Sequence, residues 1–257
     1  MDLVCEEEGN MKRICLMPLL LAMLGVGVLP AQELVQFDQA NPPFMYAKGE
    51  VAAGLYPALF KEAFSRMGVR TELTAVPWKR ALDDTDAGRA GTGGIYQNSE
   101  RLKKYDFSEP FYEERLAIFV PTGKEFGFDK MEDLYGKSFN VLSGWSYGDD
   151  FDAAVKAGKI TSDSGATNDK SNFLKMMDGR NNGVISIVES GEAAIKALKL
   201  EGKVKMLPKF LVINKVYLAF GKTARKEQIL AAFNKAMYDM KRDGTFNKIV
   251  EESFSGN

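Results

Sequence analysis

Short runs of β-branched and aromatic residues alternate along this chain with amphipathic helical patterns, and this alternation constrains the fold more than any other feature. Apolar residues at helical spacing cover one face of Leu55–Met67, which Gly68 ends, and one face of Ile229–Met240, before Gly244. Strands that alternate with helices predict an α/β architecture. The predicted strands are residues 34–37, 71–76, 116–120, 139–142, 183–188, 204–207 and 217–220.

Two glycine-containing segments resemble nucleotide-binding loops, but each lacks a residue that such a loop requires. Val216 stands where a phosphate-binding loop ending in Gly221-Lys222-Thr223 needs a glycine. Tyr96 stands where Gly91–Gly94 needs its third glycine. Both segments are therefore interpreted as turns. The linker candidates, both too short to separate independent domains, are residues 121–124 and 208–215.

The first 31 residues have the order of a secretory signal peptide. Lys12-Arg13 precedes an apolar run over residues 14–29, which Pro30-Ala31 closes. This run is shorter than the roughly 20 residues of a membrane-spanning helix. We therefore predict cleavage after Ala31 and a periplasmic location. Residues 1–10 are acidic rather than basic, which indicates that translation begins at Met11.

The composition of the predicted mature chain excludes several classes of function. Removal of residues 1–31 takes four acids and two bases from totals of 35 and 34, which leaves 31 acids and 32 bases. A nearly neutral chain does not favour binding to nucleic acid. Both cysteines, Cys5 and Cys15, lie in the removed segment, and the sequence contains no histidine. Nucleophiles that pair with histidine and zinc sites of thiolate or imidazole are therefore excluded, and no catalytic residue, metal or cofactor is predicted.

Aromatic side chains stand just beyond three predicted strands. Two prolines stiffen the loop that displays Phe44, and Trp78 opens the helix after residues 71–76. These rings either line a ligand site or pack in the core, as aromatic residues often do. The turn Ser143–Gly148 carries Trp145, Ser146 and Tyr147, which can pack against a ligand or hydrogen-bond to it, or simply form a well-packed turn.

Arg101 lies in the first turn of a predicted helix that follows a turn rich in glycine and polar residues. A cation at a helix N-terminus opposes the helix dipole, so this position favours a compensating anion. The planar guanidinium matches a carboxylate, which makes a ligand carboxylate one candidate partner. The alternative is a surface ion pair within the protein. The candidate acids for that pair are Asp106, Glu109 and Glu113.

In this order, the motifs resemble the bacterial extracellular solute-binding proteins of family 3, the polar-amino-acid family of periplasmic binding proteins. The most specific element is the Phe-Ser-x-Pro-Phe-Tyr run over Phe107–Tyr112, six residues after Arg101. The resemblance covers essentially all of the chain after residue 31. Its other elements are the Pro-Pro-Phe loop with Gly54 ten residues on, Trp78, Ser99-Glu100-Arg101, Asp133–Lys137, Gly179-Arg180 and Asp243–Thr245.

The resemblance implies a type II periplasmic binding fold, in which two α/β lobes, each a central sheet flanked by helices, are joined by two hinge crossings and close on the ligand. Lobe one is then residues 32–115 plus 216–257, and lobe two is residues 116–215. By position, Arg101 matches the arginine that binds the ligand carboxylate. The other matched positions are Asp38, Asn41, Phe44, Gly94 and Tyr96 in lobe one, with Trp145 and Ser146 in lobe two.

One departure from the family concerns the aspartate that holds a ligand ammonium group, because Ile187 occupies its position. Glu189 lies on the same strand face, and can replace the aspartate if the strand continues that far. If the strand ends earlier, one alternative is a ligand without an α-ammonium group, either a plain carboxylate or another polar solute.

These observations predict a monomeric binding protein that delivers a small polar ligand, an amino acid or related carboxylate, to the membrane permease of an ABC-type importer. One alternative is a periplasmic dehydratase of the same fold, although the cleft motifs contain no evident pair of carboxylates for acid–base chemistry. Another is a ligand-sensing module, which normally continues into a membrane helix, whereas this chain ends 13 residues after Gly244.

Overall fold

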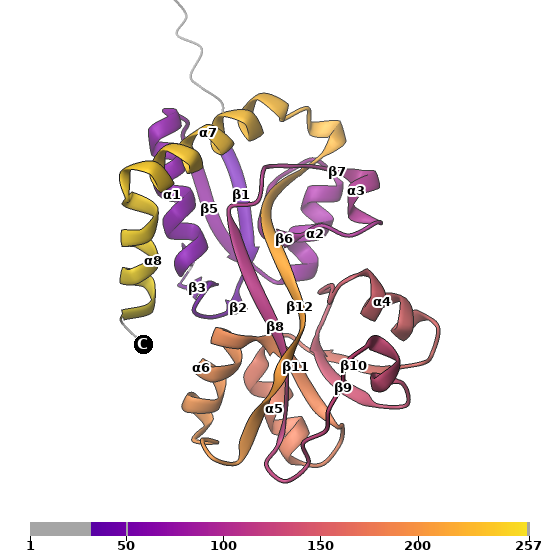
Figure 1. The fold of residues 1–257 in the computed structure, drawn as a ribbon. Helices are drawn as coiled ribbons and strands as arrows, with labels where there is room; N and C mark the ends of the chain where they lie inside the picture. The colour runs from indigo at the N-terminus through magenta and orange to yellow at the C-terminus, as the bar shows by residue number, and fades with distance from the viewer. Residues whose placement is uncertain (1–31, 50, 256–257) are drawn as a thin grey trace, which may run out of the picture. The chain divides into compact units, whose positions relative to one another are not determined.

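The computed structural model describes residues 32–49 and 51–255 (Figure 1). The predicted signal peptide, its cleavage bond, the alternative start at Met11 and both cysteines lie outside these residues. None of the helices in the described part of the chain is long and apolar enough to cross a membrane.

The predicted α/β architecture is confirmed, because helices pack against a mixed sheet of parallel and antiparallel strands. The described strands follow one hydrogen-bonded path, β10-β9-β11-β8-β12-β6-β1-β5-β4-β3-β2, and β7 pairs with β12 beside this path. The strands are β1 (Glu33–Asp38), β2 (Ala40–Asn41), β3 (Met45–Lys48), β4 (Val51–Ala53), β5 (Thr71–Val76), β6 (Gly91–Tyr96), β7 (Tyr105–Phe107), β8 (Tyr112–Pro121), β9 (Ser138–Leu142), β10 (Thr161–Ala166), β11 (Gly183–Ile187) and β12 (Val204–Gly221).

The helices divide between the two ends of the strand path. Helices α1, α7 and α8 pack together, with α1 on β4, β5 and β6, whereas α5 and α6 pack on β8 and β11 (Figure 1). The helices are α1 (Leu55–Met67), α2 (Trp78–Asp86), α3 (Arg101–Lys104), α4 (Asp149–Lys156), α5 (Asp169–Met177), α6 (Val188–Leu198), α7 (Glu227–Asp243) and α8 (Thr245–Ser255), with 3₁₀ turns η1 (Met131–Leu134) and η2 (Lys222–Ala224).

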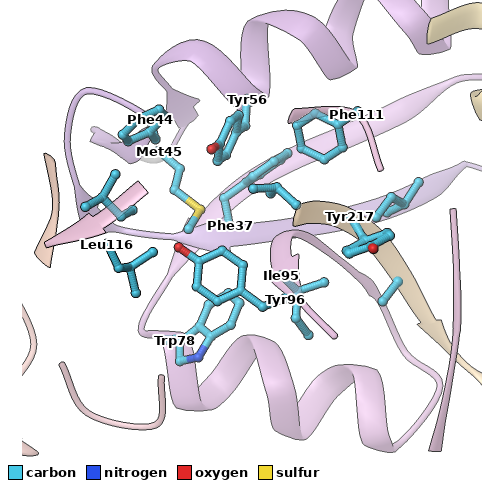
Figure 2. Close-up of a cluster of buried hydrophobic side chains, with 14 of the residues drawn as sticks. Phe37, Phe44, Met45, Tyr56, Trp78, Ile95, Tyr96, Phe111, Leu116 and Tyr217 are labelled. Carbon is cyan, nitrogen blue, oxygen red and sulfur yellow. The ribbon is translucent and has the colours of Figure 1, made fainter. Parts of the chain in front are cut away.

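The two helices predicted from apolar spacing are confirmed. α1 buries its apolar face and ends at Gly68, whose φ of 66° is left-handed and whose N–H caps the last turn. α7 ends at Gly244 in the same way, with φ of 85°. The face of α1 meets an aromatic cluster in which Phe60 stacks on Phe233 of α7 at a centroid distance of 4.7 Å. Figure 2 shows Phe44, Tyr56 and Phe111 within this buried cluster.

The interpretation of residues 91–94 as a turn is wrong, because they form most of β6. This strand is buried along its whole length, between β1 and β12. A Cβ on Gly91 would lie 2.5 Å from the ring of Phe220, and one on Gly93 would lie 2.4 Å from the ring of Phe37. The glycines therefore let aromatic rings pack directly on the strand backbone.

The strands predicted at 204–207 and 217–220 are parts of a single strand, β12, so the linker proposed between them is wrong. β12 pairs with β8 antiparallel from Val204↔Pro121 to Val216↔Tyr112, and its register shifts between Met206 and Phe210. Pro208, which has no N–H to donate, lies within that irregular interval. β8 and β12 therefore run as a continuous pair between the two helix groups (Figure 1).

Candidate ligand-binding cleft

Trp145 lies in the turn after β9 and contacts residues of β1, α2 and β6. Its indole N–H donates a hydrogen bond to Asp38 Oδ2 at 3.0 Å, at the end of β1. Its ring lies 5.9 Å from that of Trp78 and 6.0 Å from that of Tyr96, measured between centroids. Trp145 thus contacts three other residues that were predicted to form the site, Asp38, Trp78 and Tyr96. The four residues come from both ends of the strand path.

Arg101 is buried at the same junction, with 9% of its surface exposed. Its guanidinium donates to the backbone carbonyl of Tyr96 at 2.9 Å and to that of Gly144 at 3.4 Å, and it lies 5.8 Å from the Trp78 ring centroid. Burial lowers the pKa of Arg101. No carboxylate of the described residues forms an ion pair with it. The alternative of a pairing with one of the acids that follow it in the chain is therefore not observed.

Ser146 and Tyr147 are committed to hydrogen bonds within their own turn. The hydroxyl of Ser146 donates to Asp152 Oδ2 at 2.5 Å, and the backbone N–H of Tyr147 donates to the other oxygen at 3.0 Å. The hydroxyl of Tyr147 accepts the N–H of Leu142 at 2.7 Å. Asp152 belongs to the first turn of α4, so these contacts fix the turn that presents Trp145.

Three pockets lie beside Trp145, where residues from the two ends of the strand path meet. A pocket of about 360 Å³ contains Arg101, a smaller one of about 60 Å³ contains Asp38, and a central cavity of about 10 Å³ contains Tyr147, with Trp145 lining all three. The central cavity has room for about one water molecule. The central part of the cleft is therefore too small in this structure for a ligand of amino-acid size.

Asp169 is a residue of this cleft that the sequence analysis did not identify. It is the first residue of α5, and it lines both the central cavity and an adjoining pocket of about 460 Å³. Ser186 donates to its Oδ2 at 2.7 Å, while its Oδ1 is buried without a partner among the described residues. Burial raises the pKa of Asp169 to about 7, and the charge of Asp38 adds to the shift. The sequence signal was only Asn168-Asp169 after a strand, which is typical of a helix start.

Asp38 and Asn41 face this region from the first loop. Burial raises the pKa of Asp38 to about 6, although hydrogen bonds from Trp145 and Ala40 oppose the shift. Asn41 is 1% exposed and lines the central cavity. Its side-chain oxygen accepts a hydrogen bond from Ser190 of α6 at 2.7 Å, and its Nδ2 has no partner in the described part of the chain. This first loop therefore contacts α6 as well as Trp145.

Three of the predicted ligand residues lie on the core side of the cleft. Phe44 is fully buried against Tyr56 and lines none of the pockets described above. Gly94 has φ of 80°, and a Cβ there would lie 2.7 Å from the sulfur of Met45. Tyr96, labelled in Figure 2, is 4% exposed, its ring centroid lies 6.0 Å from that of Trp145, and its hydroxyl donates to Glu114.

The condition on which Glu189 could replace the family's aspartate, a strand that continues past Ile187, is not met. β11 ends at Ile187, and Glu189 lies in the first turn of α6. Its carboxylate forms an ion pair with Arg115 at 2.9 Å, where both side chains are partly exposed. A change from strand to helix removes the two-residue periodicity on which the expectation depended. Ile187 itself lines the central cavity, where it presents an apolar side chain.

The described residues contain no group of three or more histidine, cysteine or acidic side chains arranged to hold a metal. The cleft therefore consists of one buried guanidinium, aromatic rings, amide and hydroxyl groups, and buried carboxylates. Such a set binds polar molecules by hydrogen bonds and charge, with aromatic walls that exclude water.

Comparisons with known proteins agree on one family. The sequence profile of the bacterial extracellular solute-binding proteins, family 3, matches residues 34–256. The L-cystine-binding protein TcyJ of Escherichia coli K12 is 25% identical over 228 residues, which cover 86% of this chain and 82% of that protein.

Solved structures share the fold. An ancestral arginine-binding protein bound to arginine superposes with a TM-score of 0.73 at 25% identity, covering 87% of this chain and 98% of that one. The ancestral amino-acid-binding protein AncCDT-1, described as a precursor of cyclohexadienyl dehydratase, superposes with a TM-score of 0.69 at 23% identity, covering 87% and 95%. The predicted type II periplasmic binding fold is confirmed.

Proposed function

Because this chain belongs to the bacterial extracellular solute-binding proteins of family 3, we propose that it binds an amino acid or a related small carboxylate in the cleft around Trp145 and Arg101. The observation that carries the proposal is the guanidinium of Arg101, which is buried, donates hydrogen bonds to backbone carbonyls, lies near the Trp78 ring and forms no ion pair with a described carboxylate, although the charge of Asp152 acts on it. A buried charge is costly unless it is paired. A ligand carboxylate that accepts two parallel N–H bonds compensates it.

Binding requires the cleft to open and close. Arg101 donates to Tyr96 in β6 and to Gly144 after β9, so its contacts tie together the two ends of the strand path. Trp78 adds a second tie, because its indole N–H donates to the same Gly144 carbonyl at 3.1 Å. These bonds are few compared with those of the continuous β8–β12 pair. Bending of that pair is the movement that admits the ligand, with lobe boundaries near residues 115 and 215.

The cellular role that fits this activity is delivery of the ligand to the permease of an ABC-type importer. The proposed protein is a periplasmic monomer, exported by the signal peptide within residues 1–31. It uses no cofactor and binds no nucleic acid. Co-purification with a permease of the same cell, dependent on bound ligand, would test this part of the proposal separately from ligand binding.

Ligand binding is tested by isothermal titration with amino acids and small carboxylates found in a thermal-shift screen. We expect Arg101→Ala to lower the affinity by at least about 100-fold, or about 2.7 kcal/mol, because the carboxylate loses its charged partner. Arg180→Ala removes an exposed arginine and serves as the matched control, with an expected change below about twofold. An Arg101→Ala protein that melts normally and binds with unchanged affinity would contradict the proposal.

A second candidate function is dehydration of a cyclohexadienyl acid. It is supported by two buried carboxyls that line pockets of the cleft, Asp38 and Asp169, whose pKa values burial raises to about 6 and about 7, so that each can exchange a proton near neutral pH. The test is incubation with prephenate or arogenate while the aromatic product is followed by absorbance. Turnover that Asp169→Asn abolishes would favour the enzyme, whereas saturable binding without turnover would favour the binding protein.

A further inference from the structure

Glu114 is a buried acid whose two carboxylate oxygens are both used by the protein. It lies in β8, is 2% exposed, and accepts one hydrogen bond from the hydroxyl of Tyr56 in α1 and one from that of Tyr96 in β6. Figure 2 labels both tyrosines within the buried cluster. No cation of the described residues forms an ion pair with Glu114. A buried polar group with all its hydrogen bonds made fixes the positions of its partners.

Aromatic packing around Tyr56 does not depend on its hydroxyl. The ring has neighbours at centroid distances of 5.3, 5.2 and 5.8 Å, which are Phe44, Phe111 and Tyr112. A phenylalanine ring at this position makes the same contacts. Replacing a buried hydrogen-bonded group by apolar side chains of the same shape is often nearly neutral for stability. What the carboxylate of Glu114 adds is therefore a fixed direction for the hydroxyls of Tyr56 and Tyr96.

Tyr96 connects this polar group to the candidate ligand site. Its backbone carbonyl accepts a hydrogen bond from the guanidinium of Arg101 at 2.9 Å. Its ring meets that of Trp145 edge-on, with 6.0 Å between the centroids and 87° between the planes. Arg101 and Trp145 line the same pocket of about 360 Å³, whereas Glu114 lines none of the pockets at the cleft. The ring of Tyr96 cannot turn away from Trp145 without breaking its bond to Glu114.

The place of Glu114 in β8 keeps this arrangement on one side of the proposed bend. The next residue, Arg115, forms an ion pair with Glu189 of α6 at 2.9 Å and lies 5.4 Å from the ring centroid of Phe210. Neighbouring residues of β8 are thus bound to different helix groups, Glu114 to α1 and β6, and Arg115 to α6. Bending of β8 near residue 115 therefore leaves the bond between Glu114 and Tyr96 intact.

We propose that Glu114 is a positioning residue for the ligand site, whose ionised carboxylate fixes Tyr96 and, through it, the guanidinium of Arg101 and the surface on which Trp145 packs. This inference rests on the proposed function, because it explains how the same guanidinium is held ready for the ligand carboxylate. Glu114 itself touches no ligand. A carboxylate that accepts two parallel N–H bonds needs the arginine in one orientation, and a site ordered before binding has the higher affinity.

A proton on Glu114 disturbs this arrangement. The carboxylate accepts from both tyrosines, but the carboxylic acid holds a proton on one oxygen, which then donates to a tyrosine instead of accepting from it. Burial raises the pKa of Glu114 to about 7, the hydrogen bonds from Tyr56 and Tyr96 oppose the shift, and the charge of Glu189 adds to it. Asn214, which faces Glu114 from β12, is uncharged. Binding favours the ionised form, so affinity rises as pH increases from about 6 to about 8.

The experiment compares the two tyrosines that share Glu114. The probe is the tightest binder among the protein amino acids, succinate and glutarate, titrated calorimetrically into the full chain. Tyr96→Phe removes the hydroxyl that is connected to the site, and Tyr56→Phe removes the other hydroxyl and is the matched control. We expect Tyr96→Phe to lose about fivefold in affinity at pH 8 and Tyr56→Phe less than about twofold. Because both changes act on one hydrogen bond, Glu114→Gln combined with Tyr96→Phe should lose no more than the larger single loss.

The pH dependence distinguishes positioning from a purely structural role. The amide of Glu114→Gln resembles the protonated acid, so the wild type should bind about fivefold more tightly than this variant at about pH 8 and less than about twofold more tightly at about pH 5.5. Asp38 and Asp169 also titrate near this range, but they do so in both proteins, so their effect cancels in the ratio. A structural role predicts a lower melting temperature and a ratio that is the same at both pH values.

The outcomes separate the two proposals. Unchanged binding by Tyr96→Phe, an equal loss in Tyr56→Phe, or a ratio that does not vary with pH overturns the positioning role and leaves the carboxylate site at Arg101 intact. If Glu114→Gln does not fold, the comparison of the two tyrosine variants decides alone. A wild type that binds none of the probes, or an Arg101→Ala variant that binds normally, overturns the proposed function itself.

Discussion

Glu114 and Asp169 are both buried carboxylates, but the protein satisfies only the first. Glu114 is 2% exposed and accepts a hydrogen bond at each oxygen, from the hydroxyls of Tyr56 and Tyr96. Asp169 is 7% exposed and accepts one bond from Ser186, with its second oxygen unpartnered among the described residues. Burial raises the pKa of both to about 7. The two sites thus have similar protonation and differ in hydrogen bonding.

This difference in hydrogen bonding accompanies a difference in position relative to the cleft. Glu114 lies in β8, between tyrosines of α1 and β6, and lines none of the pockets at the cleft. Asp169 lines two of them. A buried polar group with all its bonds made stabilises the fold, whereas one with a bond missing in a pocket gains most when a ligand supplies it.

The largest expected effect is on stability, at the satisfied site. We expect Glu114→Ala to lower the free energy of unfolding by about 3–5 kcal/mol, because it leaves two buried tyrosine hydroxyls unpaired and opens a cavity. Glu114→Gln keeps an acceptor and a donor for the tyrosines and should cost less than about 2 kcal/mol. Urea denaturation measures both. Equal losses in the two variants would show that the two hydrogen bonds to a carboxylate, and not the volume of the side chain, matter at this position, because Gln keeps the volume of Glu.

The next largest effect is a pH dependence of the free energy of unfolding, to which Glu114, Asp169 and Asp38 all contribute. The folded-state pKa values of Asp38, Glu114 and Asp169, about 6, 7 and 7, exceed their ordinary values of 3.8, 4.5 and 3.8. Stability from these groups is therefore complete below pH 4 and is lost as pH rises through about 6 to 7. Each contributes a slope of up to about 1.4 kcal/mol per pH unit. We expect the ligand-free protein to lose about 3 kcal/mol between pH 6 and pH 8 from these three groups together.

Denaturation across this pH range checks the sign. The sequence contains no histidine, so the buried carboxyls and the terminal amino group are the main groups that titrate there. Stability that increases from pH 5 to pH 8 would contradict the burial of these acids.

A smaller effect distinguishes Asp169 from Glu114 directly. At pH 8 the carboxylate of Asp169 is ionised and half-satisfied, so its replacement by the neutral amide in Asp169→Asn should stabilise the ligand-free protein by about 1–2 kcal/mol. At pH 5 Asp169 is protonated already, and the variant should match the wild type. Glu114→Gln is the control and should not stabilise the protein at either pH. Melting temperatures at the two pH values provide the measurement.

Local periodicity was sufficient to predict much of the fold. The strand predicted at Thr71–Val76 and the helix predicted at Leu55–Met67 have those bounds in the structure, because alternation and helical spacing are set by nearby residues. β6 escaped prediction because its glycines resemble a turn in sequence. They are required by rings of Phe37 and Phe220, which are distant along the chain.

Residues of the candidate site were predicted only where the local sequence around a single residue indicates a role for it. Arg101 was singled out from its place in a helical turn, and the structure brings it to the junction with Trp78 and Trp145, although its role stays a prediction. Asp169 was missed because Asn168-Asp169 looks like any helix start. Its proximity to Asp38 and Ser186 depends on strand pairing, which no local pattern reveals.

The smallest expected effect concerns Glu189, the residue that sequence alone placed in the cleft. Its ion pair with Arg115 is partly exposed, and such pairs contribute about 0.2–1 kcal/mol. We expect Glu189→Gln to change the free energy of unfolding by less than about 1 kcal/mol and to weaken amino acids and their deamino analogues equally, by less than about twofold. Titration of both ligand types into Glu189→Gln and Asp169→Asn measures the contrast. A selective loss of amino-acid binding in Glu189→Gln, with none in Asp169→Asn, would show that Glu189 contacts the ligand from α6 and that the unpartnered oxygen of Asp169 serves no ligand.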